Sequence, residues 1–339
     1  MAHQIENYIG IVNAEHRKPW WDGMAIDGTC QYVDQPMLAE EVLAGLGADK
    51  WTIEKVPAMH NGIIIPNQHH VLRREDGRED MVLSRKTVAD GYKVFQPVES
   101  MNILDSMAGP GNLLQYNTAG TLDNGRRIFM TALIESLTFE VLRDDPVQLY
   151  LVIYDGWDGS TCLSYLRSGT RVVGQNTMNQ ALGDNTGHVK IRHTKNAQAN
   201  LDEARAALDI SVKHSEEFRE AMDYLARKKV GVPAFNDFLY EFIPVPEEKE
   251  EGNNRSHTMA VNQHAKLWDA YDNPIGGDIP GFMGTGWHAY NAVTQHFSHA
   301  ATSKKTKNGD TEASRRQSSL WFGTAASKTK RALDLLLDA

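Results

Sequence analysis

The chain has 339 residues, a mass of 37.9 kDa and a formal net charge of −9 at pH 7. Its hydrophobic content of 41% and charged content of 23% are typical of a soluble globular protein, and its length allows two domains or one large one with additions. No apolar run approaches the roughly 18 residues of a membrane span, and the N-terminus lacks the features of a secretory signal. Two cysteines, Cys30 and Cys162, exclude a disulfide framework and a four-cysteine metal site, which favours a reducing cytoplasm.

The charge is unevenly distributed along the chain. Residues 201–251 contain 13 acidic and 7 basic residues, whereas residues 160–195 contain 5 basic residues and one acidic residue. Residues 303–333 contain 8 basic and 2 acidic residues. This asymmetry allows a local basic surface on an acidic protein, although a charged run is also typical of an ordinary solvated face.

The first third of the chain predicts a short helix followed by strands. Residues 36–46 form an amphipathic pattern that ends at Gly45 and Gly47. Residues 71–74, 81–88 and 92–98 are β-rich runs separated by Asp-Gly turns. Residues 100–107 predict a helix with Ser100 as its N-cap, which ends before Gly109.

Two hairpins are expected in the middle of the chain. Residues 116–122 and 126–135 flank Asn124-Gly125, a pair that tolerates the positive φ of a type I′ turn. Residues 148–154 and 160–166 flank a second turn rich in Asp and Gly. The partial alternation in residues 127–133 indicates a strand that is buried over part of both faces. Residues 171–173 and 188–193 predict two further strands, and residues 176–182 a short helix.

Helices are predicted in the last 140 residues. Apolar residues recur from Leu201 to Leu225 with helical spacing, and Gly231 and Pro233 follow this long amphipathic helix, which is typical of core packing or an oligomer interface. Residues 287–299 predict another helix, residues 303–310 a polar tail, and the segment through Leu337 a last helix.

The order of these elements predicts an α+β fold: an antiparallel β-sheet core of hairpins with a long amphipathic helix and further C-terminal helices. We expect an N-terminal irregular or helical segment over residues 1–60 and an α+β core domain over 61–243. An acidic linker is expected over 244–256, and a C-terminal helical region with a basic tail over 257–339.

Motifs for catalysis are missing from the sequence. The segment from Gly109 to Asn112 lacks the spacing and the lysine of a phosphate-binding P-loop, and no dinucleotide fingerprint or G-x-S-x-G elbow occurs. His188 and His193 fall on opposite faces of a strand, and the histidines near His296 have no acidic or cysteine partner at ligand spacing. Cys162 is interpreted as a structural thiol, and Asp155 and Asp158 as turn formers. We therefore expect no enzyme activity, no metal and no cofactor.

Basic residues instead accompany aromatic residues on the predicted strands. A protein that holds single-stranded nucleic acid needs cations for the phosphates and exposed rings for the bases. The cationic candidates are Arg126, Arg127, Arg167, Arg171, Lys190, Arg192, His193 and Lys195. Tyr154 and Trp157 are the candidates for stacking, and His193 is expected to orient a neighbour rather than to titrate. In the alternative interpretation the rings face the core and the cations are scattered over the surface.

Several of these segments together resemble the phage/plasmid-like protein family. The similar stretches are residues 86–88, 92–99, 116–122, 124–127, 171–173, 175–177, 181–182, 191–194, 286–287, 290–294 and 320–323, with His299 and Lys328. The resemblance covers about residues 40–335, and the order of its motifs is specific. Where the family usually has a cysteine before its Asn-Thr pair, this chain has Gly174-Gln175, so no role for that thiol is transferred.

The resemblance implies a protein encoded by a phage or plasmid, often near genes of DNA metabolism. By analogy with phage recombination systems, our leading hypothesis is a non-enzymatic, homo-oligomeric protein of the host cytoplasm that binds and anneals single-stranded DNA. The alternative is a phage structural or protein-interaction factor that binds a host or phage protein, which the net charge and the acidic helix favour. A nucleotide-processing enzyme has no motif to support it.

Overall fold

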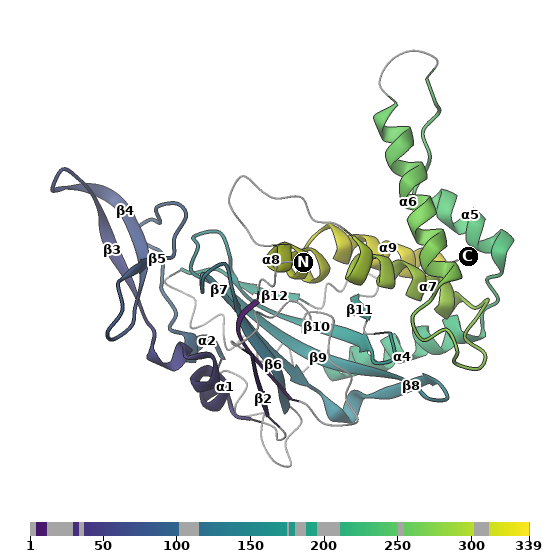
Figure 1. Cartoon of the computed structure of the whole chain (residues 1–339), viewed down its shortest axis with the longest axis horizontal. Helices are drawn as coiled ribbons and strands as arrows, with labels where there is room; N and C mark the ends of the chain where they lie inside the picture. The colour runs from purple at the N-terminus through teal and green to yellow at the C-terminus, as the bar shows by residue number, and fades with distance from the viewer. Residues whose placement is uncertain are drawn as a thin grey trace.

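A large mixed sheet lies between two layers in the computed structural model, which describes residues 5–11, 30–33, 37–101, 115–174, 176–179, 188–194, 211–249, 254–301 and 312–338. The C-terminal helices cover one face of this sheet, and α1 (Ala39–Leu46), α2 (Pro97–Met101) and a smaller sheet lie on the other side (Figure 1). The α+β class is therefore confirmed.

The large sheet has nine strands in the order β11-β10-β9-β7-β6-β1-β2, with β12 beside β10 and β8 beside β9. All described pairs are antiparallel except β1 with β2. Its strands are β1 (Ile5–Ile11), β2 (Cys30–Val33), β6 (Gln115–Leu122), β7 (Arg127–Leu133), β8 (Phe139–Leu142), β9 (Asp145–Gly156), β10 (Leu163–Arg171), β11 (Asn176–Asn179) and β12 (His188–Ile191).

Both predicted hairpins are present in this sheet. In the first, Leu122 pairs with Arg127, so the turn has four residues instead of the expected two. Asp123, Asn124 and Gly125 all have positive φ, which Asp, Asn and Gly tolerate better than other residues. In the second, β9 pairs with β10 over eight positions, from Tyr154 opposite Ser164 to Val147 opposite Arg171. Of the strand predicted over residues 171–173, only Arg171 belongs to a strand, as the last residue of β10, and residues 172–173 form a turn.

Alternate side chains of the central strands supply two separate cores. On β7, Phe129 joins the core under the C-terminal helices, whereas Ile128 and Met130 join the core under α1 and α2. Every residue of β7 is buried, which confirms the prediction of a strand covered on both faces. The sheet therefore has no bare face at its centre.

The smaller sheet has the order β3-β4-β5 and carries a long hairpin that the sequence pattern did not predict. β3 (Thr52–His60) and β4 (Ile63–Arg74) meet at Asn61 and Gly62, which both have positive φ, and β5 (Met81–Val82) pairs only with the base of β4. The hairpin extends away from the rest of the molecule (Figure 1). We call it the β3–β4 arm.

The described α-helices are α1 (Ala39–Leu46), α2 (Pro97–Met101), α4 (Ser211–Arg227), α5 (Val232–Phe242), α6 (Arg255–Asp272), α7 (Gly286–Gln295), α8 (Glu312–Phe322) and α9 (Thr324–Asp338). A short π-helix (His296–Ala300) follows α7, and 3₁₀ helices span Ala48–Lys50 and Glu135–Leu137. α7 is the central helix of its layer because each residue from Gly286 to Thr294 is buried. The helices predicted over 36–46 and 287–299 are confirmed. The described part of the long amphipathic helix ends at Arg227, and Pro233 lies in the first turn of α5 instead of ending α4.

Several local predictions are wrong. Residues 176–179 form strand β11 instead of a helix because they pair with β10. Residues 92–96 form no strand, and helix α2 begins at Pro97 instead of Ser100. Of the strand expected over 81–88, only Met81–Val82 and an isolated bridge at Val88 remain.

The proposed N-terminal segment also differs from the expectation. The boundary at residue 60 falls in the turn of the β3–β4 arm, and β1 and β2 belong to the large sheet. In the described part of the chain, no helix has both the length and the apolar character needed to cross a membrane.

Candidate functional site

Most of the ten residues predicted to bind nucleic acid are buried. The residues that are at most 9% exposed are Arg127, Arg167, Arg171, His193, Tyr154 and Trp157. Lys190 and Arg192 are exposed, Arg126 is half-buried, and Lys195 lies outside the described residues. The prediction of a continuous cationic track along the sheet is therefore wrong, and the contacts of the buried residues explain why.

Arg127 is held by two buried carboxylates. Its Nη2 lies 2.6 Å from Asp158 and its Nη1 lies 3.1 Å from Asp123, and Nη1 also donates to Ser314 of α8 at 2.6 Å. Burial opposes the charge of Asp158, but Arg127 and hydrogen bonds from Ser160 more than offset it and lower the pKa of Asp158 to about 2. This arginine joins the sheet to α8 and offers no surface to a phosphate.

Arg171 is fully buried in a different network. Its Nε donates to Asp145 at 2.7 Å, and its Nη atoms donate to the carbonyl oxygens of Ile275 and Gly276 at 3.0 and 2.9 Å. The guanidinium lies 4.1 Å above the ring of Phe282. Arg167 is also buried, which lowers its pKa, while the charge of Glu217 on α4 acts in the opposite direction. These cations stabilise contacts between layers.

The two rings proposed to stack on bases face the interior. Trp157 is fully buried, and its indole N–H donates to the carbonyl of Phe95 at 2.8 Å. Tyr154 packs edge-on against Trp321 of α8, with ring centroids 6.0 Å apart. Arg126 donates to the carbonyl oxygens of Leu83 and Asp123. None of these three groups can serve as an open stacking or phosphate contact in this arrangement.

A buried His–Asp pair lies at the centre of the remaining candidate site. His193 Nε2 is 3.0 Å from Asp155 Oδ1, and Nδ1 is 3.1 Å from the carbonyl oxygen of Lys93. Ser100 donates to Asp155 Oδ2 at 2.5 Å, and the amide of Gly156 donates to Oδ1 at 2.8 Å. Since a carbonyl only accepts, and both Asp155 oxygens already accept, these contacts are all satisfied when His193 carries two protons.

The pKa of His193 moves in the direction of this charged form. Burial lowers it, but the charge of Asp155, the hydrogen bond to that carboxylate and the hydrogen bond to Lys93 more than offset burial and raise it. The sequence interpretation of Asp155 as a turn former was incomplete, because its carboxylate joins α2, the β9 end and the segment after β12. His193 therefore both orients a neighbour and is tuned to titrate above its usual range.

A cavity of about 630 Å³ opens beside this pair, and we call it the His193 pocket. Its lining residues are Thr87, Val88, Ala89, Gly91, Tyr92, Gly159, His193 and Thr194. The ring of Tyr92 stacks on His193 with centroids 4.9 Å apart and an interplanar angle of 2°. The Tyr92 hydroxyl is buried and has no hydrogen-bond partner among the described residues. The small side chains of Ala89, Gly91 and Gly159 beside the stacked Tyr92–His193 pair leave the pocket room for a flat group.

The loop over residues 85–93 forms one wall of the pocket and is fastened to the β3–β4 arm. Lys55 Nζ donates to the carbonyl oxygens of Asp90 and Tyr92 at 2.6 and 3.2 Å. The amide of Asp90 donates to Asn67 Oδ1, and the backbones of His69 and Val88 exchange two hydrogen bonds. The wall is thus held by the base of the arm.

Three exposed cations adjoin the lining residues in the chain, and we call them the cationic rim: Lys86, Lys93 and Arg192. Lys86 precedes Thr87, Lys93 follows Tyr92, and Arg192 precedes His193. Within the described part of the chain, no ion pair involves any of the three. Residues 85–93 and 188–194 together contain five basic residues and one acidic residue, Asp90, which lies 3.3 Å from His69. The segments that line the pocket are therefore locally cationic on an acidic protein.

Sequence reasoning named Arg192 and His193 but missed Lys86, Tyr92 and Lys93 as site residues. All three missed residues lie in the stretches that carry the family resemblance. Membership in these stretches, and not the charge of the residues, was the sequence feature that could have identified them. In the described residues, no cluster of three or more His, Cys, Asp or Glu side chains is arranged to hold a metal ion.

The comparisons with known proteins give one match. The family model described as "Domain of unknown function (DUF932)" matches residues 85–321, which include every lining residue of the His193 pocket and its cationic rim. No curated protein and no solved structure matches the chain.

Proposed function

Because the chain belongs to the DUF932 family, which is generally associated with phages and plasmids, we propose that it binds single-stranded DNA at the His193 pocket. The observation that carries the proposal is an aromatic pocket whose lining residues adjoin three exposed cations, which form no ion pair with any residue that the structure describes. Lys86, Lys93 and Arg192 neutralise phosphates, and a base enters beside the Tyr92–His193 stack. The protein acts in recombination or replication, in the cytoplasm of the host, as a non-enzymatic annealing factor.

This site differs from the track that the sequence suggested. Buried guanidinium groups in the sheet neutralise carboxylates, so the DNA contacts come from loop residues 85–93 and 192–194. Cations in loops adapt to a flexible strand, while the pocket gives a fixed point for one base.

The salt dependence of affinity tests this proposal. Fluorescence anisotropy with a labelled oligonucleotide should show affinity that falls steeply with salt. The triple variant Lys86→Glu, Lys93→Glu and Arg192→Glu should reduce the slope of log affinity against log salt concentration by roughly 2, because each phosphate contact on a single strand contributes about 0.7 to that slope. A complementary-strand annealing assay should lose rate in the same variant.

A matched variant separates local contacts from total charge. Arg143, Lys249 and Lys266 are exposed and lie outside the pocket lining, and changing all three to Glu alters the net charge by the same amount. This control should keep most of the affinity. Equal losses in the two triple variants, or no binding of wild type at low salt, would contradict the proposed site.

A second candidate function, contact with another protein, is supported by the tip of the β3–β4 arm. Met59, Ile63 and Ile64 are 61%, 71% and 55% exposed there. No acidic residue occurs from Lys55 to Arg74, so the tip does not repel a second copy of this acidic chain. Clustered exposed apolar side chains are typical of protein contacts, and we propose that the arm supports homo-oligomer formation.

Light scattering after size-exclusion chromatography tests this role of the arm. The double variant Ile63→Ser and Ile64→Ser should dissociate an oligomer that wild type forms, without changing the thermal unfolding midpoint because both side chains are exposed. An oligomer that persists in the variant, or a wild type that is monomeric, contradicts self-association through the arm.

A further inference from the structure

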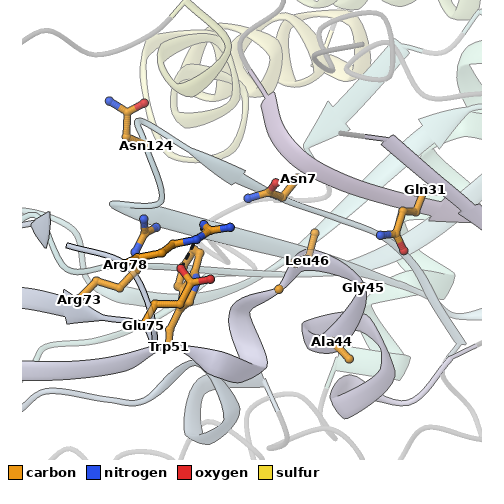
Figure 2. Close-up of a pocket in the computed structure, with 11 residues that line it drawn as sticks. Asn7, Gln31, Ala44, Gly45, Leu46, Trp51, Arg73, Glu75, Arg78 and Asn124 are labelled. Carbon is orange, nitrogen blue, oxygen red and sulfur yellow. Dashed lines mark hydrogen bonds and ion pairs between the residues drawn. The ribbon is translucent and has the colours of Figure 1, made fainter. Parts of the chain in front are cut away.

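A second cavity, of about 390 Å³, lies apart from the His193 pocket and outside its loops (Figure 2). It forms where the C-terminal end of α1 meets β1, β2 and the base of the β3–β4 arm, and we call it the Arg73 pocket. Its lining residues are Asn7, Gln31, Ala44, Gly45, Leu46, Gly47, Trp51, Arg73, Glu75, Arg78 and Asn124. Only Asn124 belongs to the part of the chain that the family model matches.

Arg73 is held in position by its neighbours. Its guanidinium lies 4.5 Å over the ring of Trp51, and Trp51 in turn packs edge-on against Trp157 with centroids 6.3 Å apart. A Cβ atom at Gly125 would overlap Arg73 Nη1, so the glycine permits the close approach of this guanidinium. A cation fixed in this way loses little side-chain entropy when it binds an anion.

A second guanidinium, from Arg78, adjoins the first. Arg78 Nη1 bonds to Glu75 at 3.2 Å, and its side chain remains 69% exposed, whereas that of Glu75 is 11% exposed. Figure 2 shows Arg73, Arg78 and Glu75 gathered above Trp51. Two guanidinium groups, those of Arg73 and Arg78, therefore lie together at this end of the pocket, beside the Glu75 carboxylate.

Carboxamide groups line the rest of the pocket. Asn7 of β1 and Gln31 of β2 lie across from the arginines in Figure 2, and Asn124 lies on the β6–β7 turn. A carboxamide both donates and accepts, so it can pair with the mixed donors and acceptors of a heterocycle edge. The free edge of a nucleobase presents this mixture, whereas a simple inorganic anion does not.

We propose that the Arg73 pocket binds a nucleoside phosphomonoester. Arg73 and Arg78 hold the phosphate, for which planar guanidinium groups offer paired donors, and the carboxamides contact the base. The cavity volume lies in the range of small-molecule sites. The same chemistry occurs in a free nucleoside monophosphate and in the phosphorylated end of a DNA strand. The inference is independent of the function proposed for the His193 pocket.

Calorimetric titration of the full chain with a nucleoside 5′-monophosphate, the corresponding nucleoside and inorganic phosphate tests this site. The monophosphate should bind, and the nucleoside should bind at least about tenfold more weakly because it lacks the anion. Arg78→Gln and Arg73→Gln should each reduce affinity by about tenfold or more. Arg78 is exposed, so its substitution should leave the unfolding midpoint unchanged even if Arg73→Gln destabilises the fold.

Arg74→Gln is the matched control, because Arg74 is the next residue but pairs with Glu54 and Asp80 outside the lining of the pocket. Its affinity should stay within about twofold of wild type. No binding of the monophosphate at about 1 mM, equal affinity for the nucleoside, or full affinity in Arg78→Gln each overturns the proposal.

A second titration identifies the source of the phosphate. Oligonucleotides with and without a 5′-phosphate are titrated into the variant with the reversed cationic rim, which removes the first site. Phosphate-dependent binding that Arg78→Gln abolishes assigns the pocket to strand ends, while binding of the mononucleotide alone assigns it to a free nucleotide. Because the rim variant keeps the Arg73 pocket, failure of one site is distinguishable from failure of the other.

Discussion

Replacing Arg171 with glutamine distinguishes a buried structural cation from a phosphate contact. The arginine is fully buried, and its guanidinium bonds to the Asp145 carboxylate and to two backbone carbonyl groups of the segment before α7. Glutamine keeps a polar side chain of moderate length but removes the charge and the planar fork. We expect the substitution to lower the free energy of unfolding and to have no direct effect on the His193 pocket.

The magnitude follows from the groups that lose a partner. Removing one member of a buried ion pair costs about 3–5 kcal/mol, because the other charge stays buried without compensation. Asp145 keeps the hydrogen bond from Trp287 Nε1 at 2.9 Å, which reduces the loss, but Ile275 and Gly276 lose donors, which adds to it. A total of about 3–5 kcal/mol is a large part of the stability of a typical domain.

Urea unfolding monitored by tryptophan fluorescence measures this loss as a lower midpoint at an unchanged slope. Arg143→Gln is the control, since its side chain is 91% exposed and lies 3.7 Å from an equally open Asp144, and it should change stability by less than about 0.5 kcal/mol. The pair Asp145→Asn with Arg171→Gln should cost less than the sum of the single changes, because no lone charge remains. If Arg171→Gln is as stable as wild type but loses oligonucleotide affinity, the buried-pair account is wrong.

Three further substitutions test other parts of the structure. His193→Gln should lower the free energy of unfolding most below about pH 6.5, and progressively less as the pH rises through the raised pKa of His193, because a raised pKa stabilises the fold only while the ring is protonated. Thermal unfolding of the wild type and the variant across pH 5–9 measures this difference. Gly125→Ala should lower the free energy of unfolding more than Gly62→Ala in chemical denaturation, because both glycines have positive φ but a Cβ atom would meet the Arg73 side chain only at Gly125. Equal losses would show that Arg73 does not need this space. Thr285→Ala should lower the free energy of unfolding by about 1 kcal/mol, because the Thr285 hydroxyl caps α7 by accepting a hydrogen bond from the amide of His288. Thr285→Ser keeps the hydroxyl and should retain most of that stability in the same assay.

The sequence predicted elements well where the signal was local. Asn124-Gly125 marks the β6–β7 hairpin because these residues tolerate positive φ, and helical spacing marks α7 and the described part of α4. Residues 176–179 were misread as a helix because their strand depends on pairing with β10, which a local pattern does not contain. The β3–β4 arm was missed because Pro57 and Pro66 interrupt the strand pattern on both sides of Asn61-Gly62.

The site could be predicted only in part, for a related reason. Arg127 and Asp158 are 31 residues apart, Arg171 and Asp145 are 26 apart, and His193 and Asp155 are 38 apart. A count of charges in one segment does not show such pairs, so three neutralised residues were taken for exposed cations. Lys86 and Lys93 were overlooked because they lie in loops and not on the strands where the search concentrated.

The position of the buried cations explains why the proposed DNA-binding site lies in the loops. Arg127 bonds to Ser314 of α8, Arg171 bonds to the segment before α7, and Arg167 interacts with Glu217 of α4. Each of these arginines thus connects the large sheet to the C-terminal layer. Among the described residues, the central strands of the sheet are covered on both faces and leave no surface for a polyanion. Lys86, Lys93 and Arg192, at the margin of the sheet, are instead exposed and have no acidic partner in the described part of the chain. The same residue type is therefore structural within the layers and available for ligands only at their edge.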